Sequence, residues 1–165
     1  MSWNIFVELK FVIMKKTPAV LAIVFFLSTL FLIYFFVFRG TVIETEDYRV
    51  TIKLSESNAD FALAEMRTFL ESIQQMNEGI LNKDADMVFN GARQSGAKVV
   101  EATPKGMMMS LPIGFKKLGL TTHAKFDAIA DSIRANNNFD YAHKELNTLL
   151  NLCITCHRTY KIETE

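Results

Sequence analysis

The feature that most constrains this chain is a run of 21 residues, from Pro18 to Phe38, that contains no charged side chain. At 1.5 Å per residue, a helix of this length measures about 30 Å, enough to cross the hydrocarbon core of a bilayer once. Three lysines precede the run, and only Arg39 follows it closely. The positive-inside rule therefore predicts a cytoplasmic N-terminus at a bacterial inner membrane and a C-terminal part in the periplasm.

A cleaved signal peptide is the alternative interpretation of this run. The apolar core of a signal peptide has about 7–15 residues and ends in a small-x-small cleavage site. The run here is longer and ends in Phe36-Val37-Phe38-Arg39, which favours an uncleaved, single-pass anchor. Residues 1–13 are apolar enough to lie in the membrane interface, but Met14 and the two lysines after it also look like a natural start of an exported protein. The sequence does not decide between these two.

The chain is therefore expected to have four parts: a cytoplasmic segment (1–17), a transmembrane anchor (18–38), a linker (39–57) and a folded domain (58–165). Residues 50–54 alternate as a short strand does, but no partner strand is evident, so an extended tether is expected there. The formal net charge is zero, with 18 basic and 18 acidic residues, which leaves no electrostatic footprint for nucleic acid. Only 3 prolines and 7 glycines occur, which favours long helices.

Apolar residues in the folded domain recur at helical spacing and predict four helices. These run from residue 58 to about 82, from about 84 to 102, from about 114 to 135, and from 140 to about 161. Between the second and third lies a predicted loop, 103–112, whose three methionines at 107–109 are expected to form an apolar lid. The inward faces are expected to consist of Ala62, Met66, Phe69, Ile73, Met76 and Ile80; Val88, Ala92, Ser95, Val99 and Ala102; Thr122 or His123, Phe126, Ile129, Ala130 and Ile133; and Leu146, Leu149, Cys153, Cys156 and Tyr160.

Cys153-Ile154-Thr155-Cys156-His157 reads C-x-x-C-H, the attachment signature of haem c. Two thiols at this spacing can bond to the two vinyl groups of one haem, and the next residue, a histidine, can ligate its iron. The chain has no other cysteine, so no second pair completes a zinc site, and His157 has no role in a dithiol exchange motif. The predicted export context is also the one in which haem c is attached. A chance match or a plain disulfide is the alternative.

Over residues 58–161, the four helices with this motif on the last one resemble the cytochrome c-prime family and its low-spin relatives. Family members typically carry an aromatic and then a basic residue shortly after the histidine, and Tyr160 and Lys161 match these. The resemblance implies an all-α, antiparallel four-helix bundle that binds one haem c, here preceded by a single transmembrane helix. It implies that Tyr160 and Lys161 bind the cofactor together with Cys153, Cys156 and His157.

In this family, the sixth coordination position of the iron faces the first helix. Low-spin members supply a methionine there, whereas high-spin members have an apolar residue and a five-coordinate iron. Met66 falls at about the matching position, so the resemblance implies that Met66 and His157 are the two metal ligands. The family often carries a basic residue one turn earlier, where Ala62 stands here, so the register is open by a turn. The alternative for Met66 is a flexible core side chain beside the haem.

Other residues are weaker candidates for the site. His123 could ligate iron, because imidazole suits that metal and its helix could face the haem. His143 lies too far along the last helix to reach the other face of the iron and is expected in solvent. Lys125, Arg158 and Lys161 could pair with haem propionates, although each is more often an ordinary surface charge.

The sequence thus predicts a membrane-anchored electron carrier, not an enzyme, that exchanges electrons with a membrane redox complex or a soluble redox protein. If Met66 does not coordinate, the resemblance allows a five-coordinate haem that binds nitric oxide or carbon monoxide. An accessory haem subunit of a respiratory or photosynthetic complex is compatible with either. The resemblance also allows a homodimer, since family members often pair through their first two helices. An interaction domain without haem is the remaining alternative.

Overall fold

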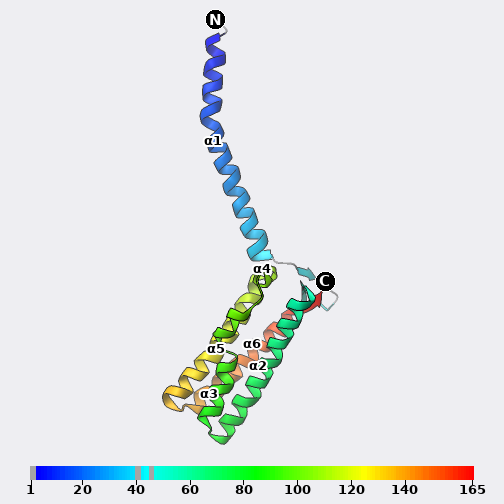
Figure 1. The fold of residues 1–165 in the computed structure, drawn as a ribbon, viewed down its shortest axis with the longest axis vertical. Helices are drawn as coiled ribbons and strands as arrows, with labels where there is room; N and C mark the ends of the chain where they lie inside the picture. Colours follow the sequence, from blue (N-terminus) through cyan, green and yellow to red (C-terminus); the bar gives the residue numbers. More distant parts are fainter. Residues whose placement is uncertain (1–2, 40–41, 45–46) are drawn as a thin grey trace. The chain divides into compact units, whose positions relative to one another are not determined.

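The computed structural model describes residues 3–39, 42–44 and 47–165, with side chains from residue 18 to 36 and from residue 47 onward (Figure 1). Helix predominates in it, which confirms the helical class predicted from the periodicity. The chain divides into residues 1–39 and residues 40–165, and each unit is described by itself.

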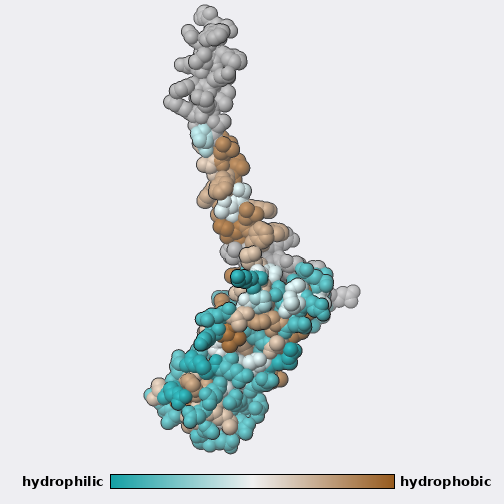
Figure 2. Space-filling view, in the orientation of Figure 1, coloured by the Kyte–Doolittle hydropathy of each residue, from teal (hydrophilic) through white to brown (hydrophobic). Residues whose placement is uncertain are grey.

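The N-terminal unit is one long helix. The α-helix α1 spans Trp3–Ile33 and continues as a π-helix, η1, over Tyr34–Arg39. Pro18 lies inside α1, although proline removes one backbone hydrogen bond from a helix interior. The segment Pro18–Phe36 is long and apolar enough to cross a membrane, a property that a signal sequence shares. Its large apolar side chains are exposed, and most of this segment is brown in Figure 2.

The second unit is built mainly from helices. They are α2 (Glu56–Asn82), α3 (Ala85–Gln94), the 3-10 helix η2 (Ala97–Ala102), α4 (Met107–Ser110), α5 (Ile113–Asn136) and α6 (Phe139–Thr159). Helix α2 packs against α3 and α6, and α5 packs against the same two helices, so these four surround one core (Figure 1). The larger core cluster consists of Met76, Ile80, Val88, Ala92, Phe126, Ile129, Ala130, Ile133, Ala142, Leu146 and Leu149.

Most of this cluster was predicted from the helical spacing, which confirms the inward face of α5, the positions of Leu146 and Leu149 in α6, and the end of α2. The second predicted helix is wrong beyond residue 94. Helix α3 ends at Gln94, the chain turns at Ser95 and Gly96, and Ala102 is exposed at the end of η2. The turn at Gly96 lets the backbone N–H of Ala97 donate a hydrogen bond of 2.8 Å to a carboxylate oxygen of Asp127 on α5.

The prediction that residues 50–54 have no partner strand is wrong. Strand β2 (Val50–Leu54) lies between β1 (Val42–Glu44), to which it is antiparallel, and β3 (Tyr160–Thr164), to which it is parallel. Part of the predicted linker 39–57 therefore belongs to the sheet, while residues 40, 41, 45 and 46 lie outside the described residues. The last helix also ends two residues early, at Thr159, so Tyr160 and Lys161 lie in β3.

The sheet contributes to a second core cluster. Ile52 and Leu54 of β2 are fully buried against Ala59 and Ala62 of α2 and against the segment around α4. The predicted loop at residues 107–110 is the short helix α4 instead. Met107 in α4 is buried in this cluster, whereas Met109 is exposed. The β2 strand and α4 thus cover one end of the helices.

Candidate functional site

A pocket opens between α2, α5 and α6, on the side covered by η2 and α4. Its cavity volume is about 100 Å³, and the pocket is partly open to solvent. Binding sites for small molecules and cofactors usually measure about 300–1,000 Å³, so a large cofactor would require this pocket to widen or would extend beyond it into solvent. Most of its walls are apolar, formed by Phe61, Phe69, Val100, Met107, Met108, Leu111, Phe115, Leu118, Leu120 and Leu152.

The C-x-x-C-H motif lies along one face of α6 near its C-terminal end. Because residues three and four apart in a helix are neighbours on its surface, Cys153, Cys156 and His157 point to the same side. All three line the pocket. Both cysteines are half-buried free thiols, and His157 is exposed in the last turn of the helix. The structure therefore brings the three predicted motif residues to one cavity.

Met66 reaches the same pocket from α2. Its side chain is half-buried and lines the pocket together with Ala62 and Phe69, which precede and follow it by one turn. The two ligands implied by the resemblance, Met66 and His157, thus line one cavity from two different helices. Met76, which lies farther along α2, is fully buried in the larger core cluster.

The environment of the cysteines does not suit disulfide exchange. Burial raises the pKa of the Cys153 thiol, and burial together with the neighbouring Cys153 raises the pKa of Cys156 to about 11. Exchange requires a thiolate, and reactive cysteines have lowered pKa values, so these thiols are poor candidates for it. Among the described residues, no three His, Cys, Asp or Glu side chains form a cluster that could hold a metal ion directly.

His123 and Glu65 form a polar wall in this otherwise apolar pocket. Nε2 of the buried His123 lies 3.4 Å from Oε1 of Glu65, and its Nδ1 donates a hydrogen bond of 2.9 Å to the carbonyl oxygen of Ser95. Burial lowers the pKa of His123, but the hydrogen bonds to Glu65 and Ser95 outweigh it, and the net shift is upward. His123 was a weak candidate from the sequence, and Glu65 was missed.

The spacing of residues in α2 contains the signal that identifies Glu65. Ala62, Glu65, Phe69, Ser72 and Met76 follow one another at intervals of 3, 4, 3 and 4, which is one helical face. Ser72 is fully buried and Glu65 is half-buried on this face. The two polar residues interrupt the apolar stripe, so a search for apolar positions alone passes over them.

Tyr160 and Lys161 do not line the pocket. The Tyr160 ring packs edge-on against Phe115, which does line it, with ring centroids 5.5 Å apart. The ammonium group of Lys161 lies 2.8 Å from a carboxylate oxygen of Glu163 and 3.9 Å from one of Asp47. Direct cofactor contacts for Tyr160 and Lys161 stay predictions.

Three further candidates lie elsewhere on the domain. Lys125 forms an ion pair with Glu145, 2.5 Å between the two charged groups. His143 and Arg158 are exposed and do not line the pocket. The solvent position expected for His143 is confirmed.

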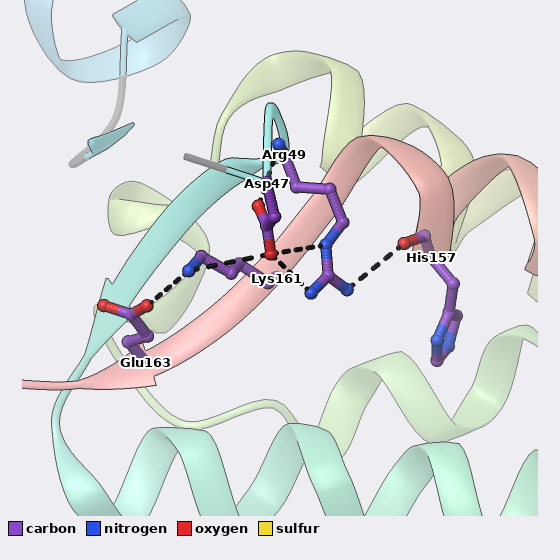
Figure 3. Close-up of polar contacts among 5 residues, drawn as sticks. All are labelled: Asp47, Arg49, His157, Lys161 and Glu163. Carbon is purple, nitrogen blue, oxygen red and sulfur yellow. Dashed lines mark hydrogen bonds and ion pairs between the residues drawn. The ribbon is translucent and has the colours of Figure 1, made fainter. Parts of the chain in front are cut away.

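A contact from the sheet side to the motif was also missed, because residues 39–57 were expected to be a tether. Arg49 is held by Asp47 through hydrogen bonds of 2.7 and 3.2 Å, and it donates one of 3.5 Å to the backbone carbonyl of His157. Figure 3 shows the guanidinium group facing this carbonyl, while the His157 ring points away from it. Arg49 therefore contacts the end of α6 through the backbone of His157, whose side chain lines the pocket.

Comparison with protein-family models, with curated proteins and with solved structures finds no match. The function must therefore be argued from the residues of the pocket and from their arrangement.

Proposed function

We propose that this chain is a membrane-anchored haem c electron-transfer protein with the antiparallel four-helix arrangement of the cytochrome c-prime type. The observation that supports it most directly is the shared pocket: Met66, Cys153, Cys156 and His157 line one cavity. A pocket with apolar walls and a few converging polar or sulfur-containing groups is typical of cofactor sites.

Each residue type in the pocket fits a part of this cofactor. The Cys153 and Cys156 thiols would each add S–H across one vinyl group to form a thioether, with no net oxidation or reduction. The His157 imidazole would bind the iron, and the Met66 thioether would bind it as the sixth ligand. When bound, the haem supplies one-electron chemistry between ferric and ferrous iron.

Met66 and the apolar walls of the pocket favour electron transfer over the binding of small ligands. Methionine as an axial ligand raises the reduction potential, and a filled sixth position leaves no site for a small ligand. The apolar walls would limit the access of water to a bound haem, and burial is one of the features that tune a haem potential. With the segment 18–38 retained as an anchor, the domain would lie at the periplasmic face of the inner membrane, within reach of a membrane redox complex.

The proposal is tested by producing the full chain in a bacterial host that attaches haem c. We expect a haem-stained band that persists under denaturing electrophoresis, and its loss in the double variant Cys153→Ala/Cys156→Ala. The absorption spectrum is then recorded for the oxidised protein, for the reduced protein, and for the reduced protein under carbon monoxide. Sharp low-spin bands that carbon monoxide leaves unchanged are expected for the wild type.

Met66→Ala tests the sixth ligand, and Met109→Ala is its control, because Met109 is exposed and does not line the pocket. We expect Met66→Ala to give high-spin bands that shift with carbon monoxide, whereas Met109→Ala retains the wild-type spectrum. A wild-type spectrum that is already high-spin would contradict Met66 ligation and favour a gas-binding protein. A colourless wild-type protein would contradict the haem assignment as a whole.

A further inference from the structure

A closed series of polar contacts joins three helices at the wall of the pocket. It leads from Glu65 on α2 to the His123 ring on α5, from that ring to the carbonyl of Ser95 after α3, and from the Ser95 hydroxyl back to Ser72 on α2. The separations are 3.4 Å for the first contact, 2.9 Å for the second and 2.7 Å for the contact between the two hydroxyl groups. Ser72 lies seven residues after Glu65, on the same face of α2.

The inner members of this series are removed from water. Ser72, Ser95 and His123 are 0%, 1% and 4% exposed. A buried polar group without a partner is costly, so each of these groups depends on its neighbours in the series. The His123 ring also packs in a T-shaped contact with the ring of Phe69, with ring centroids 5.1 Å apart.

The hydrogen bond to Ser95 shows which ring nitrogen of His123 carries a proton and which one faces Glu65. A carbonyl oxygen can only accept, so the bond to Ser95 places a proton on Nδ1 of His123. Nε2 is then the atom directed at the Glu65 carboxyl group. The hydrogen bond to Ser95 and the contact with Phe69 fix the orientation of the His123 ring. This orientation in turn fixes the position at which the Glu65 carboxyl group can contact Nε2.

Glu65 immediately precedes Met66, and the contacts of Glu65 and Ser72 hold α2 at two points, two turns apart. Two such points restrict both the rotation of α2 about its axis and its sliding along it. Met66 lies between them. Its side chain has three rotatable bonds and adapts to many shapes, so its own packing defines its position poorly.

We propose that Glu65, held by His123, positions Met66 for the sixth coordination site of the iron. This rests on the proposed function. Glu65 and His123 are positioning residues here, because they act through the turn of α2 that carries the sulfur. Without the contact between Glu65 and His123, the turn of α2 that carries Met66 would be less restrained, and Met66 would be bound to the iron in a smaller fraction of the molecules.

The test compares Glu65→Ala with Glu71→Ala in the full-length holoprotein. Glu71 lies on the same helix and carries the same charge, but it is exposed and does not line the pocket. We expect Glu65→Ala to keep its covalent haem and to shift the ratio of methionine-bound to methionine-free iron about ten- to a hundred-fold, as for the loss of one hydrogen bond to a charged group. The reduced Glu65→Ala protein would then bind carbon monoxide, whereas the reduced Glu71→Ala protein would not.

Rescue separates positioning from general stability. The amide of Glu65→Gln can still hydrogen-bond to His123, so we expect a spectrum close to that of the wild type. If Glu65→Ala does not accumulate, Glu65→Asp shortens the side chain by one methylene group and is judged by the same two spectra.

Three results would overturn the inference in distinguishable ways. If Glu65→Ala remains low-spin and inert to carbon monoxide while Met66→Ala does not, Met66 is positioned without Glu65. If the wild-type haem is attached but five-coordinate, the positioning role fails and the haem c assignment stands. If the wild type carries no covalent haem, the proposed function itself fails.

Discussion

Val50 pairs with Tyr160 in the parallel register that joins β2 to β3. Strand β3 follows directly after α6, so this pairing holds the chain immediately beyond the C-x-x-C-H motif. The contact is continued by Glu165, whose N–H donates a hydrogen bond of 3.0 Å to the carbonyl of Leu54. The strand before α2 therefore supports the end of the helix that carries the motif.

Ile52→Ala tests how much this strand contributes to stability. Ile52 is fully buried in the second core cluster, so removing most of its side chain is expected to lower the free energy of unfolding by about 2–5 kcal/mol. Lys53→Ala is the matched control on the same strand, because Lys53 is only half-buried, and it should change the free energy by about 0.5 kcal/mol or less. Urea unfolding followed by circular dichroism measures both. If Ile52→Ala changed the free energy of unfolding as little as Lys53→Ala, the sheet would contribute little to stability.

The pairing also shows which part of the fold can be predicted from the sequence. Helical spacing is a local pattern, and it placed α2, α5 and α6 within a few residues. The parallel partner of Val50–Leu54, strand β3, lies more than 100 residues away in the sequence, and no local pattern indicates it. The second helix was predicted too long because its apolar spacing continues past Gly96, where the close approach of Asp127 turns the chain.

The candidate site could likewise be predicted only in part from local sequence patterns. The C-x-x-C-H motif identifies its own residues, and the stripe on α2 directed attention to Met66. Glu65 and Ser72 occupy the buried face of α2, but their polarity is typical of solvent-facing positions. Their partners, His123 and Ser95, come from other segments, and only the packing of three helices brings these groups together.

Two glycines in helices are expected to respond to alanine in opposite directions. At Gly79, an added Cβ would lie 2.8 Å from Cγ2 of Val88 and 2.9 Å from its backbone nitrogen, so α2 and α3 would have to separate. We expect Gly79→Ala to cost about 1–3 kcal/mol. At Gly119 an added Cβ meets no atom within 4 Å, and alanine there should gain about 0.5–1 kcal/mol. Thermal unfolding measures the change in stability of both variants. A Gly79→Ala protein more stable than the wild type would contradict the close packing of α2 on α3.

His123 is expected to make stability depend on pH. Its pKa is raised in the folded protein by the hydrogen bonds to Glu65 and Ser95, which outweigh burial. A group with a raised pKa contributes fully below its ordinary value, about 6.5 for histidine, and its contribution is lost as the pH rises through the folded value. The free energy of unfolding should therefore fall as the pH rises from about 6.5.

His123→Gln removes the titrating group and is expected to flatten this dependence. Other ionisable groups line the same pocket, so the measured quantity is the difference between wild type and variant at each pH. These groups are Glu65, Lys116, Cys153, Cys156 and His157. Urea unfolding at a series of pH values provides it. Parallel curves for the two proteins would show that His123 has the same pKa in the folded and unfolded chain.

The final prediction concerns the segment Pro18–Phe36, whose length and composition suit a retained anchor and a signal sequence alike. We expect the full chain to stay in the membrane fraction after alkaline carbonate extraction, since a helix with this many apolar side chains is costly to transfer to water. Residues 40–165 behind a cleavable signal peptide should instead appear in the soluble periplasmic fraction. The intact mass identifies the cleaved alternative, because removal of the apolar helix leaves a protein far lighter than the 18.8 kDa polypeptide. A soluble, shortened product from the full-length gene would rule out the anchor and leave the pocket and its chemistry unaffected.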